Sequence, residues 1–82
     1  MITRVDEPIK VGAVFGSSIK IKPVWFVWNK RYYRIRKSTY SWMSREGSAA
    51  VYNFSVTDGN SLYEICYNAE ALKWKLMAVE TE

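Results

Sequence analysis

The chain has 82 residues and a formal net charge of +4, with 12 Lys and Arg, 8 Asp and Glu, one Cys and no His. This length accommodates one hydrophobic core, which predicts a single small domain over 1–82 with its core at about 9–79. Without His, and with a single Cys, the chain lacks the ligands of most zinc sites and the base of Ser-His and Cys-His nucleophile pairs, so we expect no metal and no cofactor.

Alternation of apolar and polar residues predicts strands in the first third of the chain. The first strand is expected at 9–15, and a turn follows at 16–18. The alternation resumes over 19–28. Pro23 is expected at a bulge or a strand start, because proline donates no N–H to a ladder.

A polar break at Asn29-Lys30 predicts a tight hairpin, since Asn tolerates a positive φ. A long strand over 31–42 follows, with a bulge near Lys37–Tyr40, where the alternation slips. Asp58-Gly59 is a strong hairpin signal and is expected to form a two-residue loop. The remaining strands are expected at 49–57, 61–67 and 73–79.

These elements predict an all-β fold with five or six antiparallel strands in meander order. No window shows a clean helical stripe, so no helix is available to cover the sheet. We therefore expect the sheet to curl into a small barrel or half-barrel. The large rings of Trp42 and Trp74 are expected in the core, at the ends of that barrel.

A two-residue loop at Asn29-Lys30 determines which side chains share a face, because directly opposite residues point the same way. The core face then holds Val24, Phe26, Trp28, Tyr33 and Ile35. The outer face holds Trp25, Val27, Tyr32, Arg34 and Arg36. Rings therefore alternate with arginines on the outer face.

Aromatic rings among cations on an exposed sheet are typical of single-stranded nucleic-acid binding. The candidate site residues are Trp25, Tyr32, Arg34 and Arg36, with Lys30 and Lys37 nearby. Two other interpretations stay open. The rings and arginines pack on one another without a ligand, or this face or an exposed strand edge binds a protein partner or a second copy, in a monomer or weak homo-oligomer.

The charges are divided unevenly along the chain. Residues 8–45 carry nine Lys and Arg and no Asp or Glu, whereas 46–82 carry two Lys and six Asp and Glu. This division predicts a basic face and an anionic partner, or else a solvated surface that keeps the domain soluble. The scattered acids form no pair suited to general acid–base chemistry, so we do not expect an enzyme.

The chain also shows no sign of export or membrane insertion. Its first residues include charges and no apolar core segment, unlike a signal peptide. No apolar run approaches the roughly 20 residues of a membrane span, and one Cys forms no internal disulfide. We therefore expect a cytoplasmic protein without a membrane partner.

A set of short motifs occurs in a characteristic order. Phe26-Val-Trp28-Asn-Lys-Arg31-Tyr-Tyr33-Arg-Ile35 is followed by Trp42, then by Tyr63-Glu64-Ile65 and Trp74-Lys-Leu76. Over roughly 9–79 the chain resembles a family of small uncharacterised bacterial domains with an F-x-W-x-x-R-x-Y-x-I/V signature. Some members are associated with translesion DNA polymerase accessory proteins, so the resemblance implies a role near DNA repair and assigns no catalytic residue. Many members have Gly where this chain has Lys30, which puts the tight turn in question.

Overall fold

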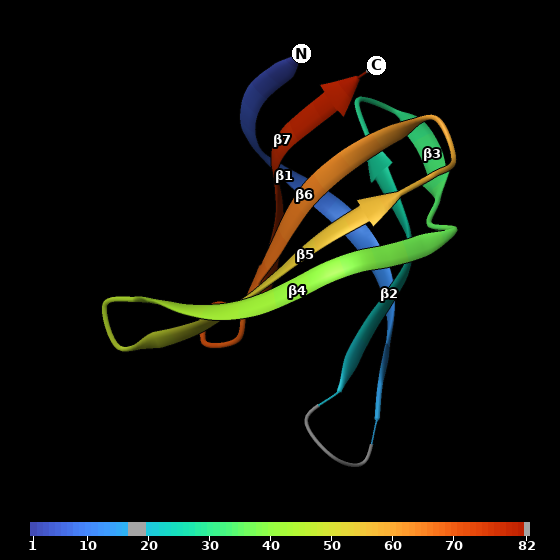
Figure 1. Ribbon diagram of the computed structural model, residues 1–82. Helices are drawn as coiled ribbons and strands as arrows, with labels where there is room; N and C mark the ends of the chain where they lie inside the picture. The colour runs from blue at the N-terminus through green and yellow to red at the C-terminus, as the bar shows by residue number, and fades with distance from the viewer. Residues whose placement is uncertain (17–19, 82) are drawn as a thin grey trace.

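The structure is a computed structural model and describes residues 1–16 and 20–81. It is all-β, with one antiparallel sheet and no helix in the part of the chain described. The seven strands are β1 (Ile2–Phe15), β2 (Ile21–Trp28), β3 (Arg31–Arg34), β4 (Lys37–Glu46), β5 (Ala49–Thr57), β6 (Ser61–Asn68) and β7 (Lys73–Thr81), as Figure 1 shows. Within these residues, no helix is long and apolar enough to cross a membrane.

The strand order is β3-β2-β1-β7-β6-β5-β4. Each strand pairs with its neighbours in sequence, and β1 also pairs with β7. The exception is β3 and β4, between which the described residues form no ladder, so the sheet is not closed into a barrel. The prediction of five or six strands is wrong because the single strand expected over 31–42 is divided in two.

That division is a bend at Ile35 and Arg36. The N–H of Ile35 donates to the carbonyl of Val24 at 3.0 Å, and the N–H of Arg36 donates to the carbonyl of Thr57 at 2.8 Å. The chain therefore leaves β2 and joins β5 within two residues. β3 and β4 are two parts of one bent strand, and they form the two edges of the sheet.

The first hairpin has the predicted register. Trp28 pairs with Arg31, Val27 with Tyr32, Phe26 with Tyr33 and Trp25 with Arg34. Asn29 and Lys30 have φ values of 53° and 65°, the left-handed conformation that a type I′ turn requires at both positions. Lys30 thus adopts the turn conformation that a glycine would favour.

The second hairpin differs from the prediction by two positions. Its ladder joins Thr57 to Leu62 and Val56 to Tyr63, so the loop is longer than Asp58-Gly59. The Asp58 carboxylate accepts the N–H groups of Asn60 and Ser61 at 2.9 and 3.0 Å, which stabilises the longer turn. A shift of two residues leaves each side chain on the face that the expected two-residue loop would give it, because the pleat repeats every two residues.

Other strand limits also differ from the prediction. β1 begins at Ile2 rather than at residue 9, and most of the turn expected at 16–18, like the strand start at 19, lies outside the described residues. A register shift between Ser38 and Tyr40 confirms the bulge expected there.

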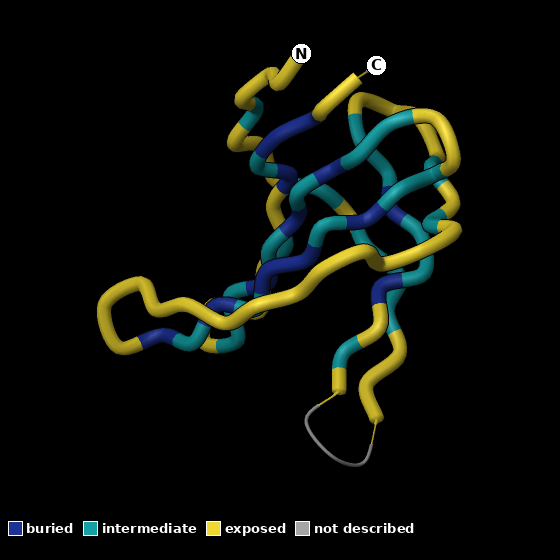
Figure 2. Tube along the Cα trace, viewed as in Figure 1, coloured by how far each residue is buried: buried dark blue, intermediate teal, exposed yellow. Residues whose placement is uncertain are grey.

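The core is one cluster from four strands. Its buried members are Phe26, Phe54, Val56, Tyr63, Ile65, Leu76 and Val79. Trp74 packs against this cluster, with its ring 5.9 Å from that of Phe54. The prediction that Trp42 is core is wrong. Trp42 pairs with Asn53 on the face opposite Phe54 and is 37% exposed, on a strand that Figure 2 shows as exposed throughout.

Candidate nucleic-acid interface

Two aromatic rings lie side by side on the outer face of β2 and β3. The ring centroids of Trp25 and Tyr32 are 5.9 Å apart, with an angle of 33° between the planes. Arg34 lies directly opposite Trp25 in the ladder. Tyr32 is 63% exposed, whereas Trp25 is half-buried. Three of the predicted site residues are therefore brought together on one face.

Trp25 owes its position to a glycine on the neighbouring strand. Gly12 of β1 pairs with Trp25, and a Cβ added at Gly12 would overlap the indole ring. The indole therefore lies against the backbone of β1, which explains why it is half-buried. Only glycine leaves the room for this close approach.

Further cations border these rings. Lys10 pairs with Val27, which places it on the same outer face, and Lys30 is exposed at the tip of the hairpin. Sequence reasoning missed Lys10, although the alternation in the first strand puts it on the face opposite Ile9. We call Lys10, Trp25, Lys30, Tyr32 and Arg34 the basic-aromatic face.

No described carboxylate forms an ion pair with the cations of this face. Residues 8–45, which include β2, β3 and most of β1, contain no Asp or Glu. Among residues 1–16 and 20–81, the one ion pair joins Lys75 Nζ to Asp6 Oδ1 at 3.3 Å. The cations of the basic-aromatic face are therefore free to contact an anion.

Arg36 does not lie on this face, contrary to the prediction, and Lys37, which was expected nearby, lies with Arg36 beyond the bend. Arg36 was expected on the outer face beside Arg34, but its N–H donates to the carbonyl of Thr57 beyond the bend. The side chain of Arg36 lies over Gly59, where an added Cβ would be 3.1 Å from its Cδ. Lys37, the first residue of β4, pairs with Thr57 of β5. Both cations lie beside the turn between β5 and β6.

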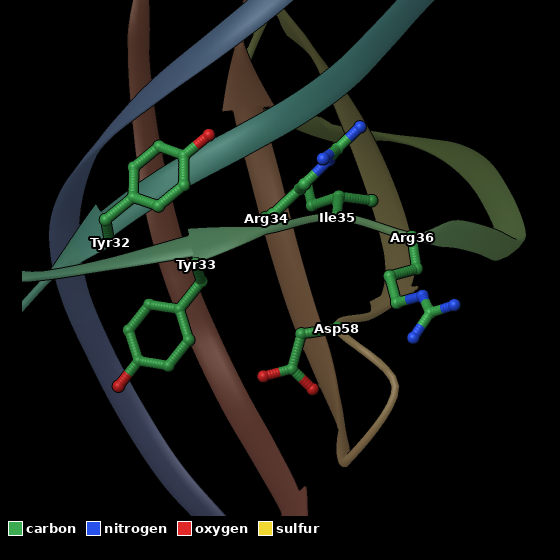
Figure 3. A pocket seen from close by; sticks show the side chains of 6 residues that line it. All are labelled: Tyr32, Tyr33, Arg34, Ile35, Arg36 and Asp58. Atoms are coloured by element: carbon green, nitrogen blue, oxygen red, sulfur yellow. The ribbon is translucent and has the colours of Figure 1, made fainter.

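A groove of about 580 Å³ runs along the free edge of β3 and is lined by Tyr32, Tyr33, Arg34, Ile35, Arg36 and Asp58. Tyr32 and Arg34 project to one side of β3 and Tyr33 to the other (Figure 3). The groove therefore joins the exposed ring and its arginine to the bend, where Arg36 provides a further cation.

Asp58 and Tyr63 form a structural pair at this groove. The Tyr63 hydroxyl donates to Asp58 Oδ2 at 3.0 Å. Partial burial raises the pKa of Asp58, but hydrogen bonds from Ser61, Asn60 and Tyr63 outweigh it, so the pKa is below its usual value. Burial and the bond to Asp58 raise the pKa of Tyr63 to about 12. Neither group titrates near neutral pH, where general acid–base catalysis is most effective.

Comparisons of the chain with protein-family models, with curated proteins and with solved structures gave no match. The resemblance described above therefore stays a prediction from the sequence. In the described part of the chain, no group of three or more Cys, Asp or Glu side chains is placed to hold a metal ion. A function has to be argued from the basic-aromatic face itself.

Proposed function

We propose that this domain binds single-stranded nucleic acid on its basic-aromatic face. The observation that carries the proposal is the exposed ring of Tyr32, which lies beside Trp25 and Arg34 on strands without a carboxylate. A base stacked on such a ring contributes about 1–3 kcal/mol. Arg34, Lys10 and Lys30 would contact the phosphates on either side.

The exposed ring of Tyr32 favours a single strand over a duplex. Stacking on Tyr32 requires an unpaired base, whereas a duplex hides the base faces in its own stack. We also propose that the open sheet curls into a half-barrel, with the basic-aromatic face on its outside. The resemblance to bacterial domains associated with translesion polymerase accessory proteins supports a cytoplasmic role near DNA repair.

Binding should depend steeply on salt. With about three to five phosphate contacts, the slope of log K against log salt is expected to be about −2 to −3.5 for a single strand. Anisotropy of a fluorescein-labelled oligothymidylate measures this slope, and a hairpin duplex of equal length is the control. Absence of binding at tens of micromolar protein in low salt would overturn the proposal, as would tighter binding of the duplex.

A further inference from the structure

A second surface, away from the basic-aromatic face, is the free edge of β4. This strand pairs with β5 on one side and with no described strand on the other, and all ten of its residues are exposed (Figure 2). Tyr40 and Trp42 stack on its outer face with ring centroids 5.4 Å apart. A long edge with unpaired N–H and C=O groups is a template for another strand.

The edge of β2 that faces β4 is also partly unpaired among the described residues. β3 pairs with β2 only from Trp25 to Trp28, so residues 21–23 have no partner strand on that side among the described residues. β4 begins after the bend that follows β3, and it diverges from the first half of β2 (Figure 1). A groove of about 480 Å³ lies between them, and we call it the β2–β4 groove.

The β2–β4 groove combines an apolar floor with a basic rim. Ile21, Tyr52 and Phe54 line it from the core side, together with Met43 of β4. Lys20 and Lys22 line it from the β2 side, and none of its lining residues is Asp or Glu. A segment that fits this groove carries apolar side chains on one face and carboxylates on the other.

We propose that the β2–β4 groove binds an extended acidic peptide, which adds a strand to the free edge of β4. Its backbone would pair with β4 between Lys37 and Glu46. Alternate apolar side chains would lie on Ile21 and Tyr52, and its carboxylates would lie beside Lys20 and Lys22. Nucleic acid fits this site poorly, because it has no backbone that matches the N–H and C=O groups of a strand.

Charge also favours an acidic peptide over a second copy of the chain. The chain has a net charge of +4. Two copies of a cationic chain repel each other, whereas a peptide that carries carboxylates is attracted to it.

The probe is a fluorescein-labelled synthetic peptide of about ten residues in which Glu and Val alternate. We expect it to bind with a Kd of about 0.1 mM or tighter and to slow hydrogen exchange of backbone amides in β4. The double substitution Lys20→Glu with Lys22→Glu should weaken binding at least about tenfold. Lys73→Glu, at an exposed lysine on β7, is the matched control and should leave the Kd unchanged.

Four results of the peptide experiment would overturn this proposal, as would either of two other occupants of the groove. The four results are no binding near 0.1 mM, equal binding of a peptide in which Lys replaces Glu, unchanged exchange in β4, and an equal loss in both charge variants. Sedimentation of the chain alone tests for self-association. Concentration-dependent dimers with slower hydrogen exchange in β4 would show that a second copy, and not a peptide, pairs with this edge. Displacement of the peptide by oligothymidylate would likewise assign the groove to nucleic acid.

Discussion

Substitution of Phe26 by Ala is expected to lower the free energy of unfolding by about 3–5 kcal/mol. Phe26 is fully buried, with its ring stacked 4.9 Å from Tyr33 and edge-on 5.1 Å from Tyr63. A chain of this length is typically stable by about 4–12 kcal/mol. The substitution should therefore remove a large fraction of the total stability. Urea denaturation followed by circular dichroism measures this loss.

Tyr40→Ala is the matched control for this prediction. Tyr40 is also an aromatic residue on a strand, but it is 66% exposed. Its removal should cost less than about 1 kcal/mol, because little buried surface is lost. Equal destabilisation by the two substitutions would contradict a core centred on Phe26.

Substitution of Gly12 by Ala should disturb both the fold and the basic-aromatic face. The new methyl group would overlap the indole of Trp25, so the ring has to move away from β1 and from its place beside Tyr32. Overpacking of this kind costs about 1–3 kcal/mol. We also expect a shifted indole N–H resonance for Trp25 and weaker oligothymidylate binding.

The control for this second prediction is Gly16→Ala. A Cβ at Gly16 would lie 3.5 Å from the nearest atom, the carbonyl oxygen of Lys20, which is an ordinary contact. This variant should keep both the Trp25 resonance and the oligonucleotide affinity. A Gly12→Ala variant with an unmoved indole would contradict the close approach of β1 to Trp25.

Local chemistry made the first hairpin predictable. Asn29 and Lys30 determine a two-residue turn, and alternation on both sides assigns Phe26 to the core and Tyr32 to the outer face. The same logic failed for Arg36, because the bend at Ile35 and Arg36 depends on pairing with β5, which is distant in sequence. No local sequence pattern predicts that the strand changes its pairing partner from β2 to β5 at that point.

Three further differences also have physical causes. The Asp58 carboxylate accepts hydrogen bonds from two backbone N–H groups. These bonds stabilise a turn between β5 and β6 that is longer than the two residues expected from Asp58-Gly59. The large ring of Trp42 predicts a core position, but β4 is an edge strand and its outer face is uncovered. Lys10 was missed because its neighbours on the outer face depend on how β1 pairs with β2.

The most direct test of the central claim compares the affinity of oligothymidylate for Tyr32→Ala and Tyr40→Ala at one low salt concentration. Both substitutions remove an exposed tyrosine ring from a strand, but only Tyr32 lies on the basic-aromatic face. We expect Tyr32→Ala to weaken binding by about 5–150-fold, the equivalent of one lost stacking contact, and Tyr40→Ala to leave the Kd unchanged. An unchanged Kd for Tyr32→Ala, or an equal loss in both variants, would contradict binding on this face.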